Sequence, residues 1–439
     1  MKLRNLLFGT MIACAFVACS NDDDPTPTPE AKGEASLVVS VKNGVSGITK
    51  AGTEAETQTA NEKNIQSLKI VLYNATTKAF LAESSTIAPG DEGDQITNNE
   101  IKFTGLNLAG TSVQILAVAN VNASFANTTT DNIGVLVTDV SGFTEDNLPM
   151  SSGLTTAVTL EEGDNYYGYS SVPAGATSLS GTPLPLIRNV ARVDLTGLTI
   201  DMSKAQVEKY VSGTAKFEIT SAFILNGRTK TKVADAGDWW NQTNVAWGNI
   251  AAAYADNAED YISGFNNSFA NFKGNKIDAY SNNITDNSEK TYTIGSSSAL
   301  TVNLENNPIQ FYVFENPQTK AARLFKGDES DPVISGKFAT ELVIKGTFSL
   351  SDAKKANSDN IYVAEKADAY WPLVIAVDGT VSPDTYQGAI HRNVVYQVSA
   401  TLAGKGYKDP TTPNPDTVEL FVKTTVVDWA TANQSVTIE

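Results

Sequence analysis

Histidine is almost absent from this chain of 439 residues, which contains only His391. Zinc sites built on several histidines are therefore excluded, and only this residue could be the base of a Ser-His-Asp triad. His391 stands just before an expected strand, which favours a surface or turn position. The GxxxxGK[ST], HExxH, GxSxG and CxxC motifs are absent as well. The sequence predicts no catalytic residue, no metal ligand and no cofactor, and hence no enzyme.

Acidic turns are the remaining places for chemistry. Residues 91–94 and 328–331 could bind calcium, but neither matches an EF-hand loop, and acidic loops are commonly just solvated. Paired carboxylates for glycoside hydrolysis are not excluded by a count of 49 acidic residues, yet nothing in the sequence brings two of them together.

Basic residues are outnumbered, with 32 against 49 acidic ones and a net charge of −17. Such a chain repels phosphate backbones, so nucleic acid is excluded as a partner. Residues 1–50 contain five basic and five acidic side chains, so their removal leaves 27 and 44 and the same net charge. An acidic surface of this kind resists lateral clumping between copies.

Cysteine is equally scarce, since Cys14 and Cys19 are the only two. Lys2 and Arg4 precede an apolar run at 6–18 that is too short to cross a bilayer and is typical of an export signal. The run ends in Phe-Val-Ala-Cys, which resembles a bacterial lipobox with Cys19 as the acylated first residue of the mature protein. A plain signal peptide cut elsewhere is the alternative. In either case no disulfide remains, so packing and strand pairing must stabilise the fold.

The segment after Cys19 is a spacer. The sequence Ser-Asn-Asp-Asp-Asp at 20–24 resembles the signal that sends Bacteroidetes lipoproteins to the outer surface, and it is also compatible with a solvated linker. The Pro-Thr alternation at 25–29 is stiff and extended. We therefore expect the protein on the cell surface.

The rest of the chain has the pattern of an all-β sandwich with long loops. Residues 35–41 place Leu37, Val39 and Val41 on one side of an extended chain. Further strands are expected at 68–73, 101–103, 113–121, 155–160, 190–195, 215–225, 309–314, 338–350, 373–377 and 394–402. A short helix is expected near 245–254.

Two features leave alternatives open. Trp239, Trp240 and Trp247 stand among Asn and Gly, so they either form a platform for glycans or pack the protein interior. A proline-rich stretch at 408–416 leads into a β-rich arm at 417–439, which either pairs with its own domain or completes another molecule.

Four short motifs occur in a characteristic order. They are Val-Ala-Asn at 118–120, Ile-Arg-Asn-Val-Ala-Arg-Val at 187–193, Phe-Tyr-Val-Phe-Glu-Asn-Pro at 311–317 and Arg-Asn-Val-Val-Tyr at 392–396. Together with the lipobox and the final arm, they resemble the fimbrillins of Bacteroidales, the type V pilins. The likeness covers nearly the whole chain and is closest to the minor-fimbrillin shaft subunit.

The resemblance implies two transthyretin-like β-sandwich domains with an N-terminal propeptide strand and a C-terminal donor-strand arm. Pro183 to Pro185 marks a boundary near residue 187. The expected parts are a signal peptide (1–18), a lipidated propeptide (19–50), an N-terminal domain (51–186), a C-terminal domain (187–407) and a linker with the donor arm (408–439). In this scheme Leu37, Val39 and Val41 belong to a removable strand, and a trypsin-like surface protease cuts between Lys50 and Ala51. The best-known members have arginine at the cut, so the identity of the protease stays open. The donor-arm residues are Val418, Leu420, Val422, Val426, Trp429, Val436 and Ile438.

The predicted function is that of a structural pilin, a shaft or stalk subunit for surface adhesion and biofilm. Its expected partners are other copies in a head-to-tail filament, tip and anchor pilins, the protease, and a host or bacterial surface ligand. Its expected location is the fimbrium, reached through a transient outer-membrane lipoprotein. The alternatives are a surface glycan-binding lipoprotein, a pilus tip or anchor subunit, and, with least support, a surface hydrolase.

Overall fold

The chain folds almost entirely into β-strands. A computed structural model describes residues 33–43, 61–86, 100–130, 133, 135–137, 144–201, 210–232, 261–264, 275–276, 281–283, 290–293, 299–304, 308–316, 340–355, 361–375, 379–381, 390, 392–402, 406, 410 and 420–428. Among these residues there is no α-helix, and the one helical element is the 3-10 turn η1 (Asn61–Lys63). No helix in this part of the chain is long and apolar enough to span a membrane. The predicted all-β fold class is confirmed.

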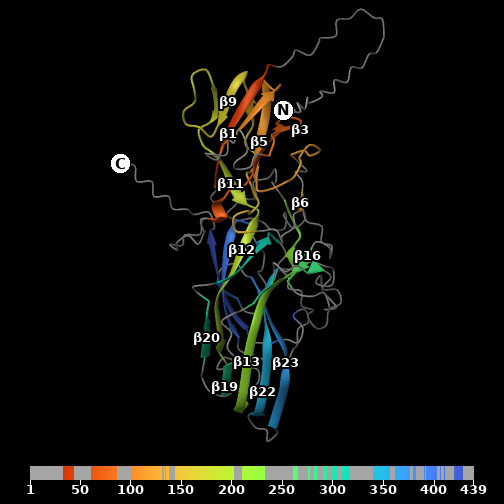
Figure 1. Cartoon of the computed structure of the whole chain (residues 1–439), viewed down its shortest axis with the longest axis vertical. Helices are drawn as coiled ribbons and strands as arrows, with labels where there is room; N and C mark the ends of the chain where they lie inside the picture. Colours follow the sequence, from red (N-terminus) through yellow and green to blue (C-terminus); the bar gives the residue numbers. More distant parts are fainter. Residues whose placement is uncertain are drawn as a thin grey trace, which may run out of the picture.

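A ten-stranded sheet forms one end of the elongated molecule, where β1, β5 and β9 are labelled in Figure 1. Its order is β10 (Thr177–Ser180), β9 (Gly163–Tyr167), β1 (Ala35–Asn43), β11 (Leu184–Arg188), β7 (Met150–Ser151), β5 (Thr111–Ala119), β2 (Leu68–Asn74) and β3 (Phe80–Glu83), with β4 (Glu100–Leu106) beside β1 and β8 (Val158–Leu160) beside β5. We call this the N-terminal sheet.

The central strands of this sheet are buried on both faces. In β2, Leu68, Ile70 and Leu72 face one cluster of apolar side chains, while Val71 and Tyr73 face a second one. Successive residues of a strand point to opposite faces, so a strand covered on both faces becomes a continuous apolar run instead of an alternating one. The first cluster, which we call the N-terminal core, is made of Ala35, Leu37, Val39, Val41, Ile65, Leu68, Ile70, Leu72, Ile101, Leu106, Val113, Ile115, Ala117, Ala119, Met150, Leu160, Leu184 and Leu186.

Two further sheets pack face to face at the other end of the molecule. The first has the order β20 (Ala299–Asn303), β12 (Val190–Asp201), β25 (Val394–Leu402), β26 (Leu420–Asp428) and β24 (Gly379–Val381), with β21 (Ile309–Phe314) beside β12. The second has the order β18 (Ser281–Asn283), β13 (Tyr210–Leu225), β22 (Glu341–Lys355) and β23 (Ile361–Val374), with β19 (Lys290–Thr293) beside β13. We call them the C-terminal sheets.

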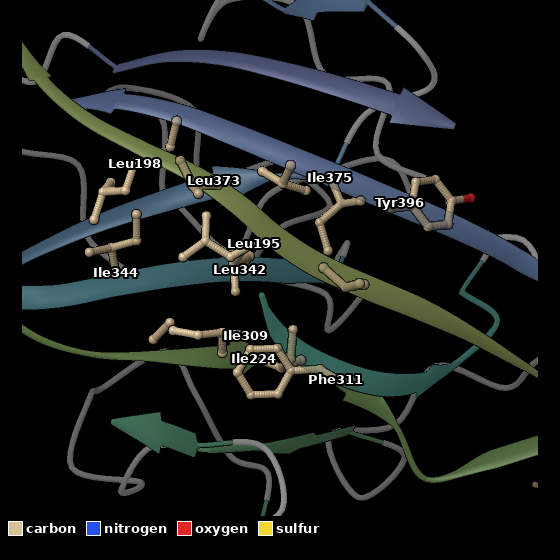
Figure 2. Packing of buried hydrophobic residues seen from close by; sticks show 14 of the residues in the cluster. Leu195, Leu198, Ile224, Ile309, Phe311, Leu342, Ile344, Leu373, Ile375 and Tyr396 are labelled. Carbon is tan, nitrogen blue, oxygen red and sulfur yellow. The ribbon is translucent and has the colours of Figure 1, made fainter. Parts of the chain in front are cut away.

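The inner faces of the C-terminal sheets share one hydrophobic core (Figure 2). Figure 2 shows Leu195 and Phe311 from one sheet beside Ile224 and Leu342 from the other. Trp371 is fully buried in this core, with its ring centroid 6.2 Å from that of Phe217. Interdigitation of alternating inward-facing side chains is what joins two sheets into a sandwich.

Two small sheets complete the fold. One consists of β14 (Gly227–Arg228), β16 (Tyr261–Ser263) and β17 (Asn275–Lys276). The other pairs β15 (Lys230–Lys232) with β6 (Val135–Val137), so it connects sequence from the two ends of the molecule.

The expected strands are found, at 309–314 and 394–402 with the predicted bounds and elsewhere with shifted ones. Residues 187–188, expected in the C-terminal domain, lie in β11 of the N-terminal sheet, and the chain changes sheet at Asn189. The expected strand at 373–377 corresponds only to the end of β23, because charged residues earlier in β23 conceal its strand character. The helix expected at 245–254 lies outside the described residues, and the domain boundaries stay predictions.

Candidate functional site

Strand β1 is an interior strand, with partners along both of its edges. It pairs antiparallel with β4 from Ala35 to Ser40 and parallel with β9 from Ala35 to Val39. Its last three residues, Val41 to Asn43, pair parallel with β11. Within the described residues, β1 therefore joins β4, β9 and β10 to the rest of the N-terminal sheet.

The side chains of β1 alternate as the sequence predicts. Leu37 and Val39 are completely buried and Val41 is 3% exposed, and all three belong to the N-terminal core. Val38 is buried on the opposite face, while Ser36 and Ser40 are partly exposed. Strand β1 thus contributes apolar side chains to the N-terminal core and backbone hydrogen bonds to the strands on both of its edges.

Polar contacts hold the edge of β9 next to β1. The Nδ2 of Asn165 donates to the carbonyl of Ser36 at 3.0 Å and to the carbonyl of Glu161 at 2.8 Å, and its Oδ1 accepts from the Glu161 N–H at 2.9 Å. The hydroxyl of Ser36 also donates to Asp164. Two of these bonds join Asn165 to Glu161, which lies outside β1, so the turn before β9 contributes to holding this edge.

Gly168 allows the chain that follows β9 to pass close to Ser40, near the C-terminal end of β1. Gly168 has φ +95°, and a Cβ at this position would lie 2.9 Å from the Cα of Pro183 and 3.0 Å from the carbonyl oxygen of Ser40. Both the backbone conformation and the close approach require glycine. The position of β1 in the sheet is therefore determined by close backbone contacts as well as by its apolar side chains.

The four motifs that define the family resemblance meet where the N-terminal and C-terminal sheets join. Arg188, Arg192 and Arg392 are each at most 4% exposed. Three equally buried acids, Glu62, Asp194 and Glu315, lie among them. The Arg192–Glu62 pair measures 2.6 Å between Nη1 and Oε1, the Arg192–Asp194 pair 3.0 Å between Nε and Oδ1, and the Arg392–Glu315 pair 2.8 Å between Nε and Oε2. We call these six residues the junction cluster.

Asparagines connect the junction cluster across the two ends of the molecule. The Nη1 of Arg188 donates to the Oδ1 of Asn393 at 3.3 Å, and the Nη1 of Arg392 donates to the Oδ1 of Asn189 at 3.0 Å. Each Arg-Asn dipeptide therefore binds the amide of the other one. Asn393 has φ 56°, in the left-handed region that asparagine tolerates better than most residues.

Asn120 makes a separate set of hydrogen bonds at the end of β5. Its φ is 57°, and its Oδ1 accepts from the backbone N–H groups of Gln66 at 2.7 Å and Ser67 at 3.2 Å. Its Nδ2 donates to the carbonyl of Leu148 at 2.9 Å. The Val-Ala-Asn motif thus ends strand β5 with a residue that organises the chain on either side of it.

Burial and neighbouring charges together shift the pKa values of Arg192 in the junction cluster and of Tyr312 beside it. Burial lowers the pKa of Arg192, but the carboxylates of Asp194 and Glu62 outweigh it, so the pKa is raised and the guanidinium stays charged. Tyr312 donates its hydroxyl to the Oε1 of Glu62 at 3.0 Å. Burial, together with the negative charge of Glu62, raises the pKa of the Tyr312 phenol well above its ordinary value.

The C-terminal arm is partly described. Strand β26 (Leu420–Asp428) contains Leu420, Val422 and Val426, and its backbone pairs antiparallel with β25 from Leu402 to Val394. It also pairs with β24 from Gly379 to Val381. This part of the arm therefore belongs to a sheet of its own molecule.

Several predicted residues lie outside the described part of the chain. They are Cys19, Lys50, Ala51, Trp239, Trp240, Trp247, His391, Val418, Trp429, Val436 and Ile438. Among the residues that the structure describes, no group of three or more His, Cys, Asp or Glu side chains could hold a metal ion.

Sequence reasoning overlooked the role of Glu62 and of the junction cluster. The available signal was the presence of Arg188 and Arg192 in otherwise apolar strands, since buried arginines require acidic or amide partners. Nothing in the local sequence identifies Glu62 as one of those partners, because 130 residues separate it from Arg192.

Comparison with known proteins gives a consistent result. The family "Major fimbrial subunit protein (FimA)" matches residues 35–188, from β1 to the end of β11. The Major fimbrium subunit FimA type-3 of Porphyromonas gingivalis is 22% identical, with 99% of each chain aligned. A putative fimbrium tip subunit, Fim1C of Parabacteroides distasonis, is 27% identical over 54% of this chain and 60% of its own length.

Solved structures agree on the fold. A putative cell adhesion protein from Parabacteroides distasonis superposes with a TM-score of 0.59 at 20% identity, over 90% of this chain and 99% of the other. A fimbrilin (FimA) from Porphyromonas gingivalis does so with a TM-score of 0.53 at 19% identity, over 92% and 100%. The names of these relatives are those of fimbrial subunits and of a putative cell adhesion protein. The chain therefore resembles fimbrial subunits over nearly its whole length, and its residues 35–188 match the FimA family.

Proposed function

We propose that the chain is a shaft or stalk subunit that polymerises by strand exchange and serves surface adhesion and biofilm formation. In this proposal the protein is exported as a lipoprotein through Cys19, a trypsin-like protease cuts after Lys50, and strand β1 leaves. The observation that carries the proposal is the position of β1. It is an interior strand that is joined to the following chain by residues 44–60, in which Lys50 is the only basic residue.

Departure of β1 without a replacement would strongly destabilise the N-terminal sheet. Burial of Leu37, Val38, Val39 and Val41 contributes roughly 1.5–3 kcal/mol for each side chain. Loss of β1 would also leave unpaired N–H and C=O groups along β4, β9 and β11. A strand from another copy restores both the ladder and the filled core, which is recognition by strand addition. Because the contact is head-to-tail and does not close on itself, the product is a filament.

The donor segment is best sought at 429–439. Residues 420–428 already pair with β25 and β24, so their departure would open a C-terminal sheet in the donating molecule. Residues 429–439 follow directly after β26 and include Trp429, Val436 and Ile438, and their use leaves that sheet intact.

The names of the relatives support two roles to different degrees. Likeness over nearly the full length to major fimbrium subunits favours a shaft subunit. The partial likeness to a putative tip subunit supports the tip role as the second candidate. A shaft subunit would donate its C-terminal segment to the next subunit, whereas a tip subunit has no need to do so.

The first experiment measures the N-terminal residue and the assembly state of protein sheared from the cell surface. We expect SDS-resistant ladders whose subunits begin at Ala51. Deletion of residues 429–439 should leave cleaved, folded monomers. Deletion of 420–439 is the less informative variant, because it also removes β26 from its sheet. A lipid-bearing monomer that begins at Cys19 would contradict the shaft role, and unchanged ladders after deletion of 429–439 would contradict the proposed donor.

A further inference from the structure

The segment that directly follows residues 44–60 is fixed at the junction between the sheets. Glu62, in η1, is only 1% exposed. Its backbone carbonyl accepts from the Nε and Nη2 of Arg188 at 3.0 and 2.7 Å. Its carboxylate Oε1 accepts from the Nη1 of Arg192 at 2.6 Å and from the hydroxyl of Tyr312 at 3.0 Å.

These contacts come from both ends of the molecule. Arg188 belongs to β11 of the N-terminal sheet, whereas Arg192 in β12 and Tyr312 in β21 belong to a C-terminal sheet. A single residue thus binds both sheets, through its backbone on one side and its side chain on the other. Loss of the carboxylate would leave a buried guanidinium with one acid fewer, which strongly destabilises such sites.

The remaining junction contacts do not depend on β1. The Arg188–Asn393 and Arg392–Asn189 hydrogen bonds and the pairing of β6 with β15 involve no residue of that strand. Removal of β1 therefore takes away none of these named contacts, nor the four hydrogen bonds of Glu62 described above.

We propose that Glu62 is a positioning residue that anchors the chain just after the cleavage point. This inference rests on the proposed cleavage after Lys50. The anchor holds residues from 61 onward at the junction when β1 departs, so that cleavage opens the N-terminal sheet while the two ends of the subunit stay aligned. An assembly intermediate of this kind presents a vacant strand position on an otherwise intact body.

Lys63 provides a direct test, because it is the next basic residue after Lys50 and follows Glu62 in η1. Cleavage by trypsin requires local opening of the chain around the bond. The full-length recombinant protein is treated with limiting trypsin, and the N-termini are followed by intact-mass spectrometry. In the wild type we expect Ala51 to accumulate and Asn64 to form slowly.

The variant Glu62→Gln retains the size of the side chain and removes its charge. We expect it to increase the rate of cleavage after Lys63 at least tenfold, while the rate after Lys50 stays unchanged. Tyr312→Phe removes a single hydrogen bond to Glu62 and should increase the rate after Lys63 at least threefold. If Glu62→Gln does not fold, this second variant decides the test. Glu161→Gln, at an exposed position, is the matched control and should leave both rates unchanged.

Two results would overturn the anchor. One is a wild-type protein that is cut after Lys63 as fast as after Lys50, and the other is a change of less than twofold in both variants. These readouts are obtained on monomers and do not require polymerisation. Failure to form ladders therefore contradicts strand exchange alone, whereas unprotected Lys63 contradicts the anchor alone.

Discussion

Arg192 and Glu62 form a buried ion pair at 2.6 Å between residues that lie 130 positions apart. Arg192 lies in the first strand of a C-terminal sheet, and Glu62 precedes the first long strand of the N-terminal sheet after residues 44–60. The pair therefore connects the two ends of the molecule in the segment that follows residues 44–60. Its neighbours Asp194 and Tyr312 complete the hydrogen bonding that a buried charge pair requires.

Substitution of Glu315 tests whether the junction cluster stabilises the fold. Glu315→Ala leaves the guanidinium of Arg392 buried without its acid, and we expect the free energy of unfolding to fall by about 3–5 kcal/mol. Urea denaturation followed by tryptophan fluorescence measures the change. Glu161→Ala, at an exposed site, should stay within about 0.5 kcal/mol of the wild type. A loss below about 1 kcal/mol for Glu315→Ala would show that solvent reaches Arg392.

Substitution of Leu37 tests the apolar seat of β1. Leu37 is completely buried, so Leu37→Ala should lower the free energy of unfolding of the uncleaved precursor by about 2–5 kcal/mol. Differential scanning calorimetry of the precursor gives the comparison. The exposed neighbour Glu34, changed to Ala, serves as the control and should have little effect. Equal effects of the two substitutions would contradict the burial of Leu37 in the N-terminal core.

Two glycine-to-alanine substitutions distinguish the cost of a positive φ from the cost of a steric clash with β1. Gly168 and Gly175 both have positive φ, 95° and 87°, but only at Gly168 would a Cβ meet other atoms within 4 Å. Gly168→Ala should therefore destabilise the precursor more than Gly175→Ala, because it adds a steric clash with Pro183 and Ser40 to the same conformational penalty. Thermal unfolding of both variants provides the measurement. Equal losses would indicate that the chain near Ser40 shifts freely.

Alkaline pH should weaken the fold through Tyr312. The folded state raises the pKa of this phenol, so the native protein keeps its proton while the unfolded chain ionises near pH 10. The unfolded state then binds fewer protons, and the free energy of unfolding falls as the pH rises above about 10. Denaturation measured between pH 8 and 11 should show a shallower decline for Tyr312→Phe. Absorbance at 295 nm should show ionisation of Tyr312 only on unfolding, and its ionisation in the native protein would contradict this prediction.

The candidate site was only partly visible in the sequence. Strand β1 was predicted because Leu37, Val39 and Val41 alternate, and the neighbouring β9 was missed because Gly-Asp-Asn-Tyr-Tyr at 163–167 has no such alternation. That segment is a strand because it pairs with β1 and β10. Its buried residue Asn165 is polar and is held by hydrogen bonds, so the segment does not show the apolar alternation of a typical strand. Strand formation of this type depends on partners that lie far away in the sequence.

The all-β class, the apolar alternation of β1, the charge and the order of the four motifs can be read from the amino-acid sequence, because they depend on composition and on the local period of two along a strand. The folded structure was needed to show that β1 is an interior strand, that residues 420–428 pair within their own molecule, and that Glu62 meets Arg188 and Arg192. The pairing of β1 with β9 and β11 and the contacts of Glu62 with Arg188 and Arg192 join residues more than a hundred positions apart. Local side-chain patterns contain no information about such distances, so these relationships arise only when the whole chain is packed.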